Sequence, residues 1–130
     1  MVGRMGTLTE TLQIIAAAVN GDDGLVRRGR YVDLDFLLGI GDESHFLTIA
    51  KGEVVSVAPG GALLRPWRFA IHIAPEAWEK FRQPLPQPGY HDLFAMCKGG
   101  EARIEGEIHA LMANLRYFKE VLAYGRQNGN

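Results

Sequence analysis

The sequence predicts an α+β fold in which helices cover one face of a single β-sheet, and three observations support this prediction. A two-residue Lys51-Gly52 turn separates two runs of strand-forming residues, which is typical of a β-hairpin. Residues 102–109 alternate between apolar or small and polar side chains, the pattern of a strand with one buried face. Apolar residues at helical spacing occur near both ends of the chain, so helices are available to cover that face.

The chain is expected to begin with an amphipathic helix over residues 7–20. Thr7-Leu-Thr-Glu10 has the pattern of a capping box, and Asn20-Gly21 supplies a stop signal. A signal peptide is the alternative, because Arg4 precedes an apolar stretch, but Glu10 and Gln13 interrupt that stretch and favour the helix. The apolar stripe of this helix consists of Leu8, Leu12, Ile15 and Val19.

Five strands are expected after a polar loop over residues 21–30. The strands span residues 31–38, 45–50, 53–58, 69–74 and 102–109. Pro66 biases the residue before it away from helix, so residues 62–68 are expected to form a loop. The residues expected on the inward faces are Val32, Leu34, Phe36, Leu38, Leu47, Ile49, Val55, Val57, Phe69, Ile71, Ile73, Ala102, Ile104, Gly106 and Ile108.

Three helices are expected beyond the fourth strand. Pro75 suits the first position of a helix, where its missing N–H costs nothing. Prolines within residues 84–88 form a stiff link to a short helix over residues 91–98. A last helix follows the fifth strand, and the polar tail from Gly125 onward is expected to fray. The apolar stripe of the last helix consists of Leu111, Leu115, Phe118 and Leu122.

The length and composition are those of an ordinary globular domain. The chain has 130 residues, of which 47% are hydrophobic and 22% charged, so we expect one domain over residues 1–130 with its core at about 7–124. A formal net charge of −1 offers no basic field for nucleic acid or an anionic membrane. No apolar run is long enough for stable membrane insertion, and the single Cys97 fits a reducing cytoplasm.

Four segments resemble the sterol carrier protein 2-type domain, also called the non-specific lipid-transfer fold, in its short bacterial form. The Lys51-Gly52 hairpin is similar to the family's second and third strands. Residues 69–78 resemble its strand that leads into an acidic-aromatic helix start, and residues 96–107 resemble its glycine turn and following strand. Residues 111–118 resemble the helix after it, whereas Glu107 stands where the family usually has Asp.

This resemblance implies a five-stranded mixed, mainly antiparallel sheet in the order 3-2-1-4-5. It also implies helices over one face of the sheet, with an apolar tunnel between sheet and helices. The function that it implies is carriage of a hydrophobic ligand such as a fatty acyl, isoprenoid or sterol-like molecule, without catalysis and without a cofactor.

The predicted tunnel is lined by residues that also suit an ordinary packed core, because a filled and a hollow interior need the same apolar faces. Gly106 leaves room for close approach by either a ligand or a helix. The tunnel residues are Leu34, Phe36, Leu47, Ile49, Phe69, Ile71, Ile73, Ile104, Gly106, Leu115 and Phe118. The residues proposed for a polar head group are Arg65, Trp67 and Arg68, for which an ordinary surface loop is the alternative.

The polar residues give little indication of a metal site or of a catalytic site. The four histidines show no metal-ligand spacing and no cysteine cluster, so we expect no metal site and interpret most of them as solvated. No serine, threonine or cysteine has a neighbouring base in the sequence. A small enzyme that uses His72 or His91 as a base is the weakest hypothesis, because a second catalytic group is missing.

We therefore predict a non-enzymatic, cytoplasmic protein that binds or carries a hydrophobic small molecule or lipid. The alternative is a regulatory or accessory subunit of a lipid- or quinone-pathway enzyme, with a vestigial cavity. The expected protein partner is a second copy in a homodimer or a partner enzyme.

Overall fold

The fold is built on a five-stranded mixed sheet in the order β3-β2-β1-β4-β5. The computed structural model describes residues 4–60 and 66–126, without the side chains of residues 4–7. The strands are β1 Asp33–Ile40, β2 Glu43–Ala50, β3 Glu53–Pro59, β4 Phe69–Ile73 and β5 Ala102–Gly106. Neighbouring strands are antiparallel except β1 and β4, which run parallel. The predicted fold class and strand order are therefore confirmed.

The β2–β3 hairpin forms at the predicted turn but contains a bulge. Lys51 and Gly52 both have positive φ, at 53° and 85°, as a primed two-residue turn requires. Beyond the turn, Ile49 pairs with Val54 whereas Thr48 pairs with Ser56, which leaves Val55 as an extra residue. The extra residue reverses the alternation, so Val54 is buried and Val55 is 56% exposed. The prediction that Val55 faces the core was wrong.

The first helix, α1 Arg4–Asn20, begins earlier than expected. Thr7 consequently lies inside the helix, and the predicted capping box does not form its start. The predicted apolar stripe is confirmed, because Leu8, Leu12, Ile15 and Val19 are all buried. Residues 23–28, expected in a polar loop, form helix α2 Asp23–Arg28, whose N-cap Asp22 accepts a hydrogen bond from Leu25 N at 3.1 Å.

The second half of the chain adds four short helices. They are α3 Pro75–Phe81, α4 Leu93–Lys98, α5 Ile108–Met112 and α6 Leu115–Ala123. The strand predicted over residues 102–109 ends at Gly106, whose φ of +94° lies in a region that favours glycine. Ile108 starts α5 and is 47% exposed, so its predicted inward orientation was wrong. The last helix is likewise two helices separated by a turn.

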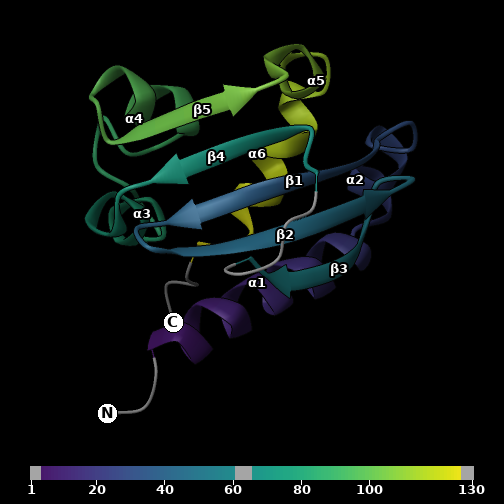
Figure 1. Cartoon of the computed structure of the whole chain (residues 1–130), viewed down its shortest axis with the longest axis horizontal. Coiled ribbons are helices and arrows are strands. Elements are labelled where there is room, and N and C mark those ends of the chain that lie inside the picture. The colour runs from purple at the N-terminus through teal and green to yellow at the C-terminus, as the bar shows by residue number, and fades with distance from the viewer. Residues whose placement is uncertain (1–3, 61–65, 127–130) are drawn as a thin grey trace.

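The core lies between the sheet and the helices α1 and α6; in Figure 1, α6 passes behind the sheet and α1 runs along its β3 side. Helices α3 and α4 lie near one end of the sheet and α5 near the other. In the predicted stripe of the last helix, Leu111, Phe118 and Leu122 are buried, whereas Leu115 is half-buried. Tyr117 is also buried, although the sequence pattern did not predict it in the core.

Two glycines allow α6 to approach the hairpin. The buried Tyr117 hydroxyl donates a hydrogen bond to Gly52 O at 2.6 Å. A Cβ atom on Gly29 would lie 2.5 Å from Tyr117 Cδ1, and a Cβ on Gly52 would lie 2.9 Å from the Gly29 carbonyl carbon. We call Gly29, Gly52 and Tyr117 the glycine junction, because the contact needs both glycines to lack a side chain.

The glycine junction predicts a large difference between Gly→Ala substitutions at Gly29 and at Gly24, at the C-cap and within helix α2. Gly29→Ala forces the Tyr117 ring to move and should lower the free energy of unfolding by about 1–3 kcal/mol. Gly24→Ala is the matched control, because a Cβ there would have its nearest neighbour at 3.6 Å and the helix propensity improves. Urea unfolding measures both, and equal stability of the two variants would contradict the junction.

Candidate functional site

The inner face of the sheet and α6 enclose a continuous layer of apolar side chains. We call this the apolar layer, and it contains most of the predicted tunnel residues. Leu34 and Ile104 are half-buried and pack against its edge. Leu115 is half-buried but lies outside this cluster. The predicted tunnel residues that are fully buried in the layer are Phe36, Leu47, Ile49, Phe69, Ile71, Ile73 and Phe118.

Three aromatic rings occupy the middle of this layer. Phe36 on β1 and Phe69 on β4 stack with ring centroids 5.3 Å apart. Phe118 of α6 meets both rings edge-on, with centroids at 5.5 and 5.2 Å. Side chains therefore fill the layer at this phenylalanine cluster. A ligand could enter there only if these rings shifted, together with the helix that carries one of them.

Gly106 is separate from the phenylalanine cluster. It is exposed at the end of β5, and a Cβ there would lie 2.7 Å from Trp67 Cζ3 and 2.9 Å from Arg68 O. The close approach that this glycine permits is thus to the start of β4. Two of the predicted head-group residues, Trp67 and Arg68, lie beside it, while Arg65 falls outside the described residues. Arg68 is 3.8 Å from the carboxylate of Glu107.

His45 departs from the prediction that most histidines are solvated. Because β2 begins at Glu43, His45 lies on the same inward face as Leu47, and only 4% of it is exposed. His45 Nε2 is 2.9 Å from Thr9 Oγ1 of α1, and Nδ1 is buried without a hydrogen-bond partner among the described residues. Desolvation lowers the pKa of His45, against a smaller opposing effect of Glu43. The sequence could have predicted this burial, because His45 is two residues before Leu47 in the same strand and therefore shares its inward face.

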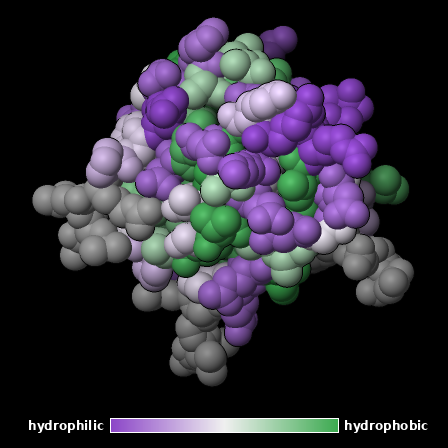
Figure 2. Space-filling model, turned by 90° about the vertical axis from the view of Figure 1, so that its right-hand side faces the viewer, coloured by the Kyte–Doolittle hydropathy of each residue, from purple (hydrophilic) through white to green (hydrophobic). Residues whose placement is uncertain are grey.

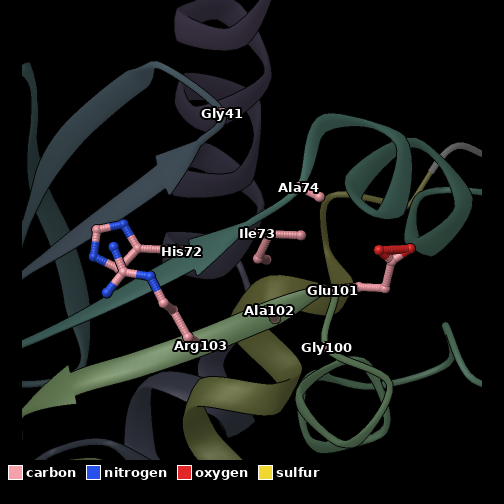
Figure 3. Close-up of a pocket in the computed structure, with 8 residues that line it drawn as sticks. All are labelled: Gly41, His72, Ile73, Ala74, Gly100, Glu101, Ala102 and Arg103. Atoms are coloured by element: carbon pink, nitrogen blue, oxygen red, sulfur yellow. The ribbon is translucent and has the colours of Figure 1, made fainter.

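A surface pocket of about 290 Å³ lies where β4 ends and β5 begins, beside two glycine turns, and Figure 3 shows its lining. His72 and Arg103 project side by side from the two strands. Both contact Glu105, at 3.1 and 3.2 Å, and the hydrogen bond from His72 is the largest of the effects that lower the pKa of this carboxyl. The lining residues described contain no serine, threonine or cysteine, so the pocket supplies no hydroxyl or thiol nucleophile.

The described part of the chain offers neither a metal site nor a membrane-spanning helix. Within residues 4–60 and 66–126, no group of three or more histidine, cysteine or acidic side chains could hold a metal ion. Over the same residues, no helix combines the length and apolar character needed to cross a membrane. Cys97 is half-buried, and burial raises the pKa of its thiol, which makes it less reactive.

Figure 2 shows one face of the molecule by hydropathy. Outside the grey atoms, hydrophobic side chains on this face form small areas separated by hydrophilic ones. Such scattered apolar residues are normal on protein surfaces. A hydrophobic ligand would therefore find its largest apolar surface in the interior layer and not on this face.

The fold is that of sterol carrier protein 2 domains. A crystal structure of sterol carrier protein 2 matches with a TM-score of 0.72 and 12% identity, over 91% of this chain and 95% of that chain. A conserved hypothetical protein from Thermus thermophilus matches at 0.67 and 11%, over 93% and 90%. The UbiJ-SCP2 ubiquinone synthesis protein matches at 0.50 and 13%, over 88% and 96%. No protein-family model and no curated protein matches the sequence.

The environment of His45 predicts a loss of stability in mild acid. Its pKa is lowered in the folded state, so the unfolded chain binds the proton more tightly. The stabilising contribution is therefore present above the unfolded pKa of about 6.5 and is lost as the pH falls below it. Wild type should lose more of its urea midpoint between neutral and mildly acidic pH than His45→Gln does. His91→Gln, at an exposed histidine, is the control and should behave as wild type.

Proposed function

We propose that the chain forms a single cytoplasmic domain that binds and carries a hydrophobic, lipid-like ligand in the apolar layer, without catalysis. The observation that supports this most is the apolar layer between the sheet and α6, in a fold shared with sterol carrier protein 2. Fatty acyl, isoprenoid and sterol-like molecules all have the apolar surface that such a layer can bury.

Burial energetics favour a long apolar chain. Each buried methylene contributes about 0.8 kcal/mol, so roughly ten contribute about 8 kcal/mol. Association costs at least about 4 kcal/mol, and the remainder corresponds to a dissociation constant of about 1 mM. Micromolar binding therefore needs a chain of roughly fifteen or more methylenes, before any cost of moving the phenylalanine cluster.

Helix α6 is the element that would move to admit such a chain. Arg28 and Glu120 form a salt bridge at 2.5 Å, but both side chains are 38% exposed, and surface ion pairs contribute little. The stronger attachments are the buried hydrogen bond of Tyr117 and the packing of Phe118. Admission of a ligand would keep the first attachment and rearrange the second, so that α6 pivots about the glycine junction.

A second function is favoured by one observation, the packing of the phenylalanine cluster. If those rings stay packed, the layer serves as a solid core, and the chain acts as an accessory or regulatory subunit of a partner enzyme. The likeness of fold to a ubiquinone synthesis protein accords with this alternative. Native mass spectrometry of the protein from cells distinguishes the two, because a retained acyl-sized adduct supports the carrier, and a clean mass with a co-purifying enzyme supports the subunit.

The proposed binding layer predicts that two tryptophan substitutions on β5 differ in their effect on ligand uptake. Ile104 faces the layer beside Ile71, whereas Arg103 is its neighbour on the outward face of the same strand. Ile104→Trp fills space in the layer and should weaken uptake of a fluorescent long-chain acyl probe about tenfold. Arg103→Trp should leave uptake unchanged.

Both variants place tryptophan, a residue with high strand propensity, in the strand, and circular dichroism and melting temperature check that each is folded. Equal binding by the two variants would place the ligand outside the layer. Failure of wild type to bind any long-chain probe would remove the carrier function and leave the accessory subunit.

A further inference from the structure

A groove lined by both apolar and charged residues lies on the outer side of α6. It has a volume of about 260 Å³ and runs between α6 and the segment that joins α3 to α4. Phe81, Leu93 and Leu122 contribute to its walls and are otherwise almost wholly buried. These three side chains belong to the same core as the apolar layer, so the groove is an opening onto the outer side of that core.

A fixed cation stands at the rim of this groove. The Arg126 guanidinium lies 4.6 Å from the centre of the Phe81 ring, and its Nε donates a hydrogen bond to Phe81 O at 3.1 Å. A terminal nitrogen donates to His91 O. Both acceptors are backbone carbonyls, and no carboxylate among the described residues lies within ion-pair distance of Arg126. The guanidinium is thus held in position by two carbonyls and makes no direct ion pair among the described residues.

The two carboxylates in the groove have other partners. Asp92 accepts a hydrogen bond from Ala95 N at 2.9 Å, as the N-cap of α4, and lies 3.7 Å from Lys119 Nζ. Glu120 is bound by Arg28 at 2.5 Å and by Arg116 at 3.3 Å. Burial lowers the pKa of Arg126, against a smaller opposing effect of Asp92, so an additional anion beside the guanidinium would be stabilising.

We infer that this groove binds the anionic head group of an amphiphile, a carboxylate or a phosphate monoester, against Arg126. Lys119, which also lies 3.7 Å from Asp92, is the second cation, and the start of the apolar chain lies along Phe81 and Leu122. This inference rests on the proposed function and specifies its ligand as a charged amphiphile. A guanidinium suits this task because it offers several donors in one plane to carboxylate or phosphate oxygens.

Binding of three amphiphiles with the same chain length tests the inference: hexadecanoate, hexadecyl phosphate and the uncharged hexadecanol. Arg126→Gln should weaken both anions at least about fivefold, as loss of a charge-assisted hydrogen bond does, and should leave hexadecanol unchanged. Arg103→Gln makes the same charge change on β5, at a side chain outside the groove, and should change none of the three. The anion bound more tightly by wild type identifies the head-group class.

Two further variants, Lys119→Gln and Arg68→Gln, test the position of the head group. If Arg126→Gln does not fold, Lys119→Gln replaces it and should weaken the anions about two- to fivefold. Arg68→Gln tests the head-group position predicted from the sequence, and selective loss of anion binding there, but not at the groove, overturns the inference. Equal affinity of wild type for hexadecanoate and hexadecanol also overturns it and leaves the carrier function intact. If wild type binds none of the three, the carrier function itself is refuted.

Discussion

The docking of α6 by two adjacent side chains is the interaction on which the rest of the interior depends. Within the glycine junction, Tyr117 donates a hydrogen bond to Gly52 O in the hairpin turn. Phe118 packs against the rings of Phe36 and Phe69 on the sheet. Consecutive residues of a helix point in different directions, so one short helix is tied to two separate parts of the sheet. The first tie is a directional hydrogen bond and fixes position. The second is apolar packing, which another apolar group can replace.

The regular parts of the fold could be predicted because local sequence determines them. In the middle of β1, Phe36 and Leu38 are more buried than the residue between them, as period-2 alternation predicts. On β4, Phe69, Ile71 and Ile73 are buried as predicted, and Ala70 on the other face is buried as well. The errors arose where pairing or backbone geometry overrides that period. The bulge at Val55 depends on how β3 aligns with β2, which no local pattern reveals. The alternation predicts that Gly106 is a small inward-facing residue of the strand. Its φ is positive instead, so the strand ends there and Ile108 begins helix α5.

The candidate site could be predicted only in part, for a similar reason. Alternation identifies the apolar lining, but packing decides whether such a lining is hollow or filled by Phe36, Phe69 and Phe118. The groove was not predictable, because Arg126 belongs to a tail that was expected to fray. Instead Gly125 is buried in contact range of Trp78, and Arg126 is hydrogen-bonded to two carbonyls of distant segments.

One contact of α1 also limits how the molecule meets its own copies. The side-chain amide of Asn20 donates to Val54 O at 2.9 Å and accepts from Val54 N at 2.8 Å, as the backbone of a neighbouring strand would. β3 is an outer strand of the sheet, and an outer strand with free backbone groups can recruit another chain. Asn20 satisfies both groups of Val54 at the edge and α1 lies alongside, so sheet-to-sheet aggregation is disfavoured on this side. At the opposite edge, the charged side chains of Arg103 and Glu105 on β5 have the same protective effect.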